Sequence, residues 1–441
     1  MGSDKIHHHH HHMSEPVIKS LLDTDMYKIT MHAAVFTNFP DVTVTYKYTN
    51  RSSQLTFNKE AINWLKEQFS YLGNLRFTEE EIEYLKQEIP YLPSAYIKYI
   101  SSSNYKLHPE EQISFTSEEI EGKPTHYKLK ILVSGSWKDT ILYEIPLLSL
   151  ISEAYFKFVD IDWDYENQLE QAEKKAETLF DNGIRFSEFG TRRRRSLKAQ
   201  DLIMQGIMKA VNGNPDRNKS LLLGTSNILF AKKYGVKPIG TVAHEWVMGV
   251  ASISEDYLHA NKNAMDCWIN TFGAKNAGLA LTDTFGTDDF LKSFRPPYSD
   301  AYVGVRQDSG DPVEYTKKIS HHYHDVLKLP KFSKIICYSD SLNVEKAITY
   351  SHAAKENGML ATFGIGTNFT NDFRKKSEPQ VKSEPLNIVI KLLEVNGNHA
   401  IKISDNLGKN MGDPATVKRV KEELGYTERS WSGDNEAHRW T

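Results

Sequence analysis

The sequence predicts an α/β protein: an irregular α/β barrel of about seven strands, with an N-terminal α+β domain that C-terminal strands complete. Three observations predict this. Short apolar runs alternate with helix-like segments after residue 183, strand-like and helix-like patterns mix before residue 150, and a hairpin pattern follows residue 380. Parallel strands need a crossover connection, which the intervening helices supply. The expected divisions are an expression tag (1–12), the N-terminal domain (13–150), the barrel (151–380) and a C-terminal segment that packs on the N-terminal domain (381–441).

The composition is that of an ordinary globular protein. The 441 residues carry a net charge of −3, so no overall basic field attracts nucleic acid or a membrane surface. Six of the 17 histidines belong to the tag-like start. Cys267 and Cys337 lie in apolar contexts without disulfide or zinc spacing, as in a reducing compartment. No signal-like segment and no apolar run of spanning length is seen, so we expect a cytoplasmic protein without membrane contact.

The N-terminal region contains clear local signals. "DVTVTYKYTNRS" (41–52) and "HYKLKILVSGSW" (126–137) alternate as strands do. "KEAINWLKEQFSYL" (59–72) and "TEEEIEYLKQEI" (78–89) have helical periodicity, and Thr78 is a good N-cap. "TILYEIPLLSLISEAYF" (140–156) is predicted as a strand that runs into a helix.

Helix-like and strand-like segments then alternate. "QLEQAEKKAETLFDNG" (168–183) predicts a helix that stops near Gly183. Seven apolar runs follow: GIRFSEFG, SLLLGTS, KPIGTVAH, GLALTD, YVGVRQD, KIICYSD and ATFGIG. Each run ends in a polar or glycine element. Since ligands bind at the carboxyl ends of barrel strands, seven such ends favour a ring over an open sheet.

The C-terminal segment has a different pattern. In "LNIVIKLLEVNGNHAIKISD" (386–405), Asn396-Gly397 separates two alternating stretches, which predicts a hairpin. The polar, proline-containing stretch 374–385 is most simply a loop.

The strand ends carry groups that suit chemistry. His244, Asp283, Asp308 and Asp340 follow one another at spacings of 39, 25 and 32 residues, about one βα unit apiece. Any single aspartate here could be a helix N-cap, but independent caps do not explain a histidine at the equivalent place. In "HHYHDVL" (321–327), by contrast, adjacent histidines on a helix point in different directions, so metal binding is not expected.

The segment "RQDSGDPVEY" (306–315) predicts a tight turn before a helix. Asp311 is suited to cap a helix that begins at Pro312. Its carboxylate and that of Asp308 suit sugar hydroxyls or indirect contact with Mg²⁺ better than phosphate. A solvated, capped turn is the alternative for Asp311.

Two further motifs suit an anionic, flat substrate. Gly364, Gly366 and Thr367 follow the last strand, where barrel enzymes often bind phosphate. "EFGTRRRRS" (188–196) places arginines at a strand end, where Arg192 suits carboxylate or phosphate and Phe189 suits a planar ring. The alternatives are a solvated basic face and a packed core phenylalanine.

Taken together, the ordered motifs resemble nicotinate phosphoribosyltransferase, of the type II phosphoribosyltransferase group. The resemblance runs through "DTDMYKITM", "EFGTRRR", "GTSN", "GTVAHEW", "LTDTFGT", "RQDSGDP", "YSDSLN" and "FGIGTNFTND". It implies that nicotinate and 5-phosphoribosyl 1-pyrophosphate give nicotinate mononucleotide and pyrophosphate in NAD salvage. It also implies ATP as a co-substrate, Mg²⁺ as a cofactor, and phosphorylation of an active-site histidine.

The resemblance assigns roles to single residues. His244 matches the phosphorylated histidine, and Asp283 matches a carboxylate that orients its ring. The pyridine ring is expected between Phe189 and a tyrosine of a neighbouring subunit that matches Tyr27, so the family implies a homodimer with shared sites. Arg192 corresponds to the arginine near the ring carboxylate. The neighbourhoods of the ribose and its 5-phosphate match Asp308, Asp340, Arg306, Gly364, Gly366 and Thr367.

The position after the "GT" strand end separates close relatives. The nicotinamide enzyme has an aspartate there, whereas Ser226 follows Thr225 in this chain. Like charges about 4 Å apart cost about 4 kcal/mol at an effective dielectric near 20, so the serine favours nicotinate. The alternatives are a nicotinamide phosphoribosyltransferase, a phosphosugar-acting α/β barrel and a non-catalytic nucleotide sensor.

Overall fold

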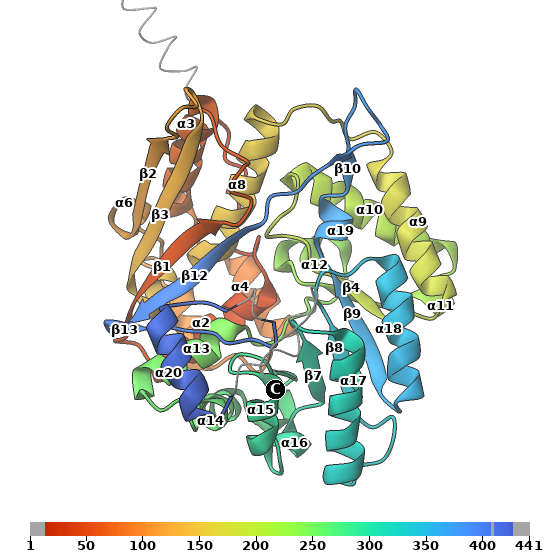
Figure 1. Ribbon diagram of the computed structural model, residues 1–441. Coiled ribbons are helices and arrows are strands. Elements are labelled where there is room, and N and C mark those ends of the chain that lie inside the picture. The colour runs from red at the N-terminus through yellow and green to blue at the C-terminus, as the bar shows by residue number, and fades with distance from the viewer. Residues whose placement is uncertain (1–13, 407–409, 427–441) are drawn as a thin grey trace, which may run out of the picture.

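The computed structural model describes residues 14–406 and 410–426, so the tag-like start lies outside the described residues. Two sheets organise this part of the chain (Figure 1). An antiparallel sheet is on the left of that view, and a parallel sheet covered by helices is on the right. Among the described residues, no helix is both long and apolar enough to cross a membrane.

The antiparallel sheet joins the two ends of the chain. Its order is β13 (Asn398–His399), β12 (Ile388–Val395), β1 (Thr43–Asn50), β3 (Tyr127–Ser136) and β2 (Ile113–Glu119). The predicted strands at 41–52 and 126–137 are confirmed. So is the hairpin, because Asn396 and Gly397 both have positive φ, as a two-residue turn requires. Its strand β12 pairs along the whole of β1, so the C-terminal segment completes this sheet.

Helices pack beside this sheet. They are α2 (Met26–Asn38), α3 (Lys59–Tyr71), α4 (Glu79–Glu88), α5 (Ser94–Ser101) and α8 (Glu144–Phe158). The predicted cap is confirmed: Thr78 and Glu81 form a reciprocal capping box at the start of α4. The strand predicted at the start of 140–156 is wrong, since Ile141–Tyr143 form a 3₁₀ helix. All three residues are buried, and a short apolar run alone does not distinguish a buried strand from a buried helix.

The parallel sheet contains six strands rather than seven. Its order is β5 (Leu222–Thr225), β4 (Phe186–Glu188), β9 (Leu360–Ile365), β8 (Ile335–Tyr338), β7 (Gly304–Gln307) and β6 (Leu279–Leu281). The first strand β4 pairs with the last strand β9, as in a ring. No ladder joins β5 to β6, however, so the predicted closed barrel is not seen among the described strands.

The segment 237–244 explains why β5 and β6 are not joined. It makes one parallel bridge, from Pro238 to Thr225, and then leaves the sheet. Gly240 passes so close to α2 that a Cβ there would lie 2.9 Å from the backbone nitrogen of Tyr27. The strand predicted here is therefore wrong: contact with the N-terminal region replaces a ladder, and His244 begins a helix.

Helices cover the parallel sheet, and α9, α10, α17 and α18 lie on its outer side in Figure 1. They and the remaining longer helices are α9 (Gln168–Asp181), α10 (Leu197–Gly213), α12 (Ile228–Tyr234), α13 (His244–Ser254), α14 (Ala260–Phe272), α15 (Thr287–Ser293), α17 (Pro312–Ser320), α18 (Val344–Glu356) and α20 (Pro414–Glu423). The predicted helix 168–183 is confirmed, with Gly183 in the left-handed region after it. The loop predicted at 374–385 contains the minor pair β10 (Phe373–Arg374) and β11 (Lys382–Ser383).

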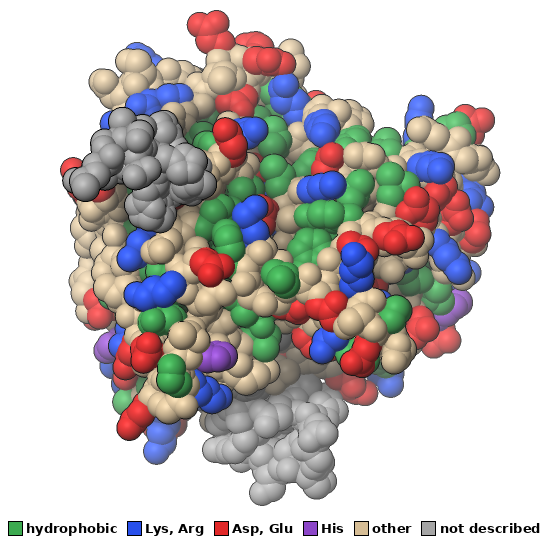
Figure 2. All heavy atoms as spheres, turned by 90° about the horizontal axis from the view of Figure 1, so that it is seen from above, with side chains coloured by type: hydrophobic (Ala, Val, Ile, Leu, Met, Phe, Trp, Pro, Cys, Tyr) green, Lys and Arg blue, Asp and Glu red, His purple; other side chains and the backbone are tan. Residues whose placement is uncertain are grey.

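Charges of both signs are interspersed over the face seen in Figure 2, with apolar side chains between them. Two buried hydrophobic clusters lie beneath the surface. One joins the N-terminal helices to the C-terminal strands and to α13, and the other lies between the parallel sheet and its helices. The segment from Gly240 to His244 runs from the parallel sheet to α13, so residues from both parts of the chain meet at its carboxyl-end loops.

Candidate active site

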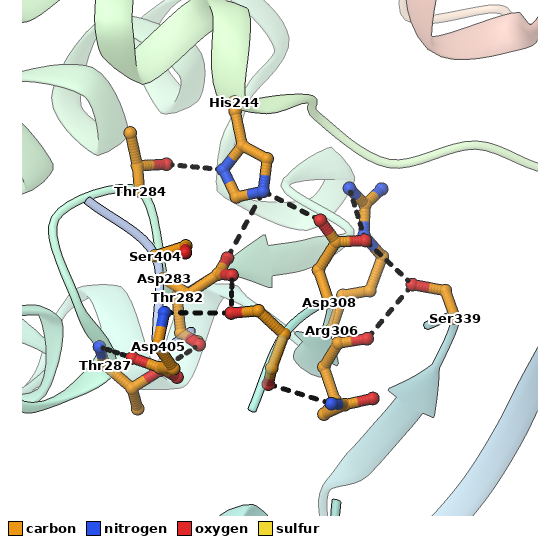
Figure 3. Close-up of polar contacts among 12 residues, drawn as sticks. His244, Thr282, Asp283, Thr284, Thr287, Arg306, Asp308, Ser339, Ser404 and Asp405 are labelled. Carbon is orange, nitrogen blue, oxygen red and sulfur yellow. Dashed lines mark hydrogen bonds and ion pairs between the residues drawn. The ribbon is translucent and has the colours of Figure 1, made fainter. Parts of the chain in front are cut away.

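His244 is the first residue of α13 and faces two carboxylates (Figure 3). Its Nε2 lies 2.8 Å from Asp308 Oδ2 and 3.3 Å from Asp283 Oδ1. Its Nδ1 lies 2.9 Å from the hydroxyl oxygen of Thr284. The tips of β6 and β7 therefore meet the start of α13, as the spacing of these residues predicts.

The contacts of the imidazole indicate its tautomer. Asp308 Oδ2 accepts a hydrogen bond from Nε2–H, and Asp283 Oδ1 faces the same nitrogen, which leaves the lone pair of Nδ1 toward the Thr284 hydroxyl. Burial lowers the pKa of His244, and Lys402 lowers it further, while Asp283 and Asp308 oppose these effects. The ring is therefore neutral at neutral pH, with Nδ1 as its nucleophilic nitrogen.

The sequence did not indicate four groups around this histidine. They are Thr284, Ser309, Lys402 and Asp405. Thr284 and Ser309 directly follow the predicted aspartates, so their positions in "TDT" and "DSG" were the available signal. Lys402 and Asp405 come from the C-terminal segment, and no local pattern links that segment to the tips of β6 and β7.

Arg306 lies at the other side of Asp308. Its Nη1 donates to Thr241 Oγ1 at 2.6 Å, and its Nη2 lies 3.9 Å from Asp308 Oδ1. Ser339, at the end of β8, contacts the same carboxylate oxygen at 3.4 Å. The tips of β7 and β8 thus combine a cation, a carboxylate and a hydroxyl group within a few ångströms of His244.

Tyr27, Arg192 and Asp25 form a second polar group. The guanidinium carbon of Arg192 lies 5.4 Å from the centre of the Tyr27 ring, and its Nε lies 3.5 Å from Asp25 Oδ2. Ser226 donates to Asp25 Oδ1 at 2.7 Å. Tyr27 reaches Arg192 within one chain, so this pairing does not need the neighbouring subunit that the resemblance implies.

Asp25 changes the interpretation of Ser226. Ser226 stands where the nicotinamide enzyme has an aspartate, yet its hydroxyl donates directly to the carboxylate of Asp25. Burial raises the pKa of Asp25, whereas Arg192 and Ser226 lower it. The cation beside Asp25 is Arg192, whose side chain is 46% exposed.

Gly364 and Gly366 lie against Phe189 and its backbone. A Cβ on Gly364 would lie 2.2 Å from the Phe189 ring, and one on Gly366 would lie 3.0 Å from the Phe189 carbonyl oxygen. Gly364 thus makes room for a flat aromatic ring. The half-buried Phe189 follows β4, which pairs with β9.

Thr225 and three of the arginines have structural contacts. Thr225 is buried and donates to the buried Glu188 at 2.7 Å. Arg194 forms a buried bidentate pair with Asp23, at 2.8 and 3.0 Å. Arg195 lies 3.6 Å from the centre of the Phe156 ring, and Arg193 Nε donates to a backbone carbonyl. Of the arginine run, Arg192 alone lies beside Tyr27 and Asp25.

The remaining predicted residues lie at other strand-end loops. Asp340 follows β8 and is half-buried, with the Ser341 hydroxyl 3.3 Å away. Thr367 begins the short helix α19 (Thr367–Thr370) after β9. Asp311 caps α17 through Val313 N at 2.8 Å, so the capping interpretation is confirmed.

Several basic side chains on and beside the antiparallel sheet lie near one another, and one of them, Lys402, also acts on the pKa of His244. Burial lowers the pKa of Lys391 to about 8, and the positive charges of Arg51, Lys402 and Lys47 lower it further. Burial lowers the pKa of Arg193 to about 10, and the positive charges of Arg192 and Arg51 lower it further. Such mutual repulsion between cations is relieved by a bound anion. The sequence did not predict this cluster, because its members lie on strands far apart in the chain.

His244, Asp283 and Asp308 also have metal-like spacing, since one ligand atom of each lies within 4.8 Å of the others. Mg²⁺ prefers oxygen ligands in an octahedral arrangement, whereas this group includes an imidazole nitrogen that is already hydrogen-bonded to Asp308 and lies 3.3 Å from Asp283. This group therefore does not fit Mg²⁺, and it is better described as an acid–histidine cluster.

Comparison with known proteins assigns the family. The family model described as "Nicotinate phosphoribosyltransferase (NAPRTase) family" matches residues 184–428, and the model of the corresponding N-terminal domain matches residues 22–152. The chain belongs to the nicotinate phosphoribosyltransferase family. The predicted resemblance is thereby confirmed.

Individual relatives match over nearly their whole length. A "Probable nicotinate phosphoribosyltransferase" of Schizosaccharomyces pombe is 46% identical, over 93% of this chain and 99% of the relative. A "Nicotinate phosphoribosyltransferase" of Methanosarcina mazei is 37% identical, over 90% and 96%. A crystal structure of the Porphyromonas gingivalis nicotinate phosphoribosyltransferase has a TM-score of 0.83 at 32% identity, over 93% and 100%. The mixed fold of a parallel and an antiparallel sheet is thus shared with solved members of the family.

Proposed function

We propose that the protein joins nicotinate to 5-phosphoribosyl 1-pyrophosphate, giving nicotinate mononucleotide and pyrophosphate. The pyridine nitrogen attacks C1 of the ribose, and the C1–oxygen bond to pyrophosphate breaks. The observation that carries the proposal is the meeting of His244 with Asp283 and Asp308 in a chain of this family. The family membership also favours this reaction over a phosphosugar-acting barrel.

The base site is proposed at Phe189, Tyr27 and Arg192. Because Gly364 has no Cβ, the Phe189 ring packs directly against β9, and we propose that this ring stacks on the flat pyridine. Arg192 supplies a planar cation for the nicotinate carboxylate, and Asp25 holds its Nε side. Ser226 contributes by keeping Asp25 hydrogen-bonded.

ATP is proposed to act through a phosphohistidine. His244 Nδ1 attacks the γ-phosphorus of ATP, a nitrogen–phosphorus bond forms, the bond to the β,γ-bridging oxygen breaks, and ADP leaves. The positive charge that develops on the ring is stabilised at Nε2–H by Asp308 and Asp283. The Thr284 hydroxyl, 2.9 Å from Nδ1, turns away to admit the phosphoryl group.

The ribose and diphosphate are proposed to lie between Asp308, Asp340 and Arg306. Glycosyl transfer places positive charge on the sugar, which nearby carboxylates stabilise. The cations Arg51, Lys391 and Lys402 suit the diphosphate. Thr225, Gly366 and Thr367, at the ends of β5 and β9, are proposed to line the same substrate site.

Mg²⁺ is proposed to enter with the polyphosphates of the substrates, because the His244 group does not suit it. The proposed setting of this reaction is NAD salvage in the cytoplasm, by a homodimer with shared sites. In that setting the base and the phosphate donors are small soluble molecules. Neither nucleic acid nor a membrane is a proposed partner.

A second candidate base is nicotinamide. Asp25 favours it, because the carboxylate beside Arg192 is able to accept a hydrogen bond from an amide nitrogen. Pyrophosphate release with each base distinguishes the two. We expect release with nicotinate at a kcat/KM at least about tenfold higher, since a lost charge pair at a recognition site costs more than about 1.4 kcal/mol. Release with nicotinamide alone would reverse the assignment.

A further inference from the structure

The C-terminal segment packs against the loop that carries Asp283 and Thr284. Ile403 N donates to the Thr284 carbonyl oxygen at 2.7 Å. Asp405 accepts from the backbone nitrogen of Thr287 at 2.8 Å and from its hydroxyl at 2.5 Å. The loop that contacts His244 is thus held by residues more than a hundred positions later in the chain (Figure 3).

Ser309 connects this segment to the buried aspartate. Its hydroxyl donates to Asp283 Oδ2, while Asp283 Oδ1 faces His244 Nε2 at 3.3 Å. The oxygen of the same hydroxyl accepts from the backbone nitrogen of Asp405 at 2.9 Å. A continuous series of contacts therefore runs from Asp405 through Ser309 and Asp283 to the imidazole.

We propose that Ser309, fixed by the backbone amide of Asp405, is a positioning residue that orients the Asp283 carboxylate toward His244. The C-terminal segment thereby becomes part of the phosphohistidine site. This inference rests on the proposed function of His244. Asp283 orients the imidazole of His244, and Ser309 in turn orients the Asp283 carboxylate without acting on the substrate itself.

The burial of the series explains why one hydroxyl matters. The Asp283 side chain is 1% exposed, and Ser309 is also 1% exposed, so water does not readily replace the lost donor. Without the Ser309 hydroxyl, nothing holds Oδ2 in place, so the Asp283 carboxylate is able to rotate and Oδ1 no longer faces His244 Nε2 in a fixed direction. Mutation of a residue that orients a ligating or catalytic group typically lowers metal affinity or activity about 10- to 100-fold.

Asp405 provides a further sign that the series is tightly packed. Burial raises its pKa from 3.8 to about 7, and the negative charge of Asp283 is the next largest cause. The two carboxylates thus affect each other across Ser309. Asp405 itself stays in place through Thr287, whose hydroxyl also contacts Thr282 at 2.9 Å.

The experiment compares Ser309→Ala with Ser320→Ala in the full-length protein. Ser320 is a matched control, because its hydroxyl donates to the backbone carbonyl of Asn357 at 2.7 Å and it is the last residue of α17, whose first turn is the end that follows Ser309. We expect Ser309→Ala to slow phosphohistidine formation from ATP by about tenfold or more. The KM values for nicotinate and ATP should stay within twofold of wild type, and Ser320→Ala should leave the rate unchanged.

A readout without turnover separates this inference from the proposed function. The Nε2–H proton of His244, observed by NMR at neutral pH, should shift in Ser309→Ala and remain in place in Ser320→Ala. An unchanged resonance together with an unchanged phosphorylation rate overturns the inference. A wild-type protein that forms no phosphohistidine refutes the proposed function instead, and the resonance alone then decides the role of Ser309.

A second variant covers the case in which Ser309→Ala does not fold. Thr287→Val removes the hydroxyl donor to Asp405 but keeps the backbone donor at 2.8 Å. We expect a several-fold slower phosphorylation with unchanged KM for nicotinate. A rate equal to wild type in a folded Thr287→Val protein contradicts the positioning series.

Discussion

Lys28 and Glu245 form a buried ion pair, with Nζ 2.6 Å from Oε1, and each directly follows a predicted site residue. Lys28 follows Tyr27 in the first turn of α2, and Glu245 follows His244 in the first turn of α13. Lys28 also binds Glu144, the first residue of α8, at 2.8 Å. Tyr27 and His244 are thus held relative to one another, because Lys28 joins the first turns of α2, α8 and α13.

The second oxygen of Glu245 is equally engaged. Its Oε2 accepts from Tyr46 at 2.5 Å and from Trp137 Nε1 at 2.7 Å. A buried charge of this kind is tolerated only when its partners satisfy it. Lys28, Tyr46 and Trp137 engage both oxygens of Glu245, so its role is to hold α13 rather than to take part in chemistry.

Removing Lys28 should destabilise the protein strongly. Lys28→Ala leaves the buried Glu245 and the partly buried Glu144 without the cation between them, so we expect about 3 kcal/mol of lost unfolding free energy. Lys232→Ala is the control, because Lys232 pairs with the largely exposed Glu80 and should cost about 1 kcal/mol or less. Chemical denaturation of both variants measures the difference. Equal losses would mean that the buried pair does not hold the helices.

Filling the space at Gly364 should impair base binding. Gly364→Ala places a Cβ 2.2 Å from the Phe189 ring, so the ring must shift from its position. Overpacking costs about 1–3 kcal/mol, which corresponds to a roughly 5- to 100-fold rise in the KM for nicotinate. Gly213→Ala, at a glycine whose Cβ would meet nothing within 4 Å, should leave this KM unchanged. Loss of binding in both variants, or in neither, would contradict the assignment of Phe189.

Two neighbouring arginines should give opposite phenotypes. Arg192→Ala removes the exposed cation beside Tyr27, so the KM for nicotinate should rise about tenfold while the melting temperature barely changes. Arg194→Ala breaks the buried pair with Asp23 and should cost about 3 kcal/mol of stability. Steady-state kinetics and thermal unfolding of both variants provide the test. The opposite pattern would place the base at Arg194.

The dependence of stability on pH should change in Asp405→Asn. The folded pKa of Asp405 is about 7, above its ordinary value of 3.8. Between these values the folded protein keeps a proton that the unfolded chain has lost, so this group lowers stability as pH rises from about 4 to about 7. Above pH 7 its contribution is constant.

Asparagine at 405 removes this titration and retains the shape of the side chain. The free energy of unfolding of Asp405→Asn should therefore fall less than that of wild type between pH 4 and 7. Urea denaturation at several pH values measures both curves. Parallel curves would show that Asp405 does not hold a proton in this range.

The sequence predicted much of the fold because its local signals are strong. The capping box at Thr78 and the Asn396-Gly397 turn each fix one conformation, and the structure has both. The run 237–244 did not become a strand, because Gly240 packs against the start of α2, a contact between segments over 200 residues apart. Local periodicity contains no information about such a contact.

The same distinction holds for the site. The spacing of His244, Asp283 and Asp308 predicted their meeting, because parallel strands bring successive carboxyl ends to one edge. Asp25 and Asp405 were missed as neighbours of Ser226 and Asp283. Both come from outside the βα units, and only the packing of the chain ends brings them in.

His244 is proposed to receive the phosphoryl group of ATP. The most direct measurement is mass-spectrometric mapping of the acid-labile phosphoryl group after incubation with ATP and Mg²⁺, in wild type, in His244→Ala and in the exposed-histidine control His259→Ala. We expect the label on His244 in wild type and in the control, and none in His244→Ala, where weaker ATP-independent transfer persists. An acid-labile phosphoryl group on the His244→Ala protein, equal to that of wild type, would contradict phosphorylation at His244.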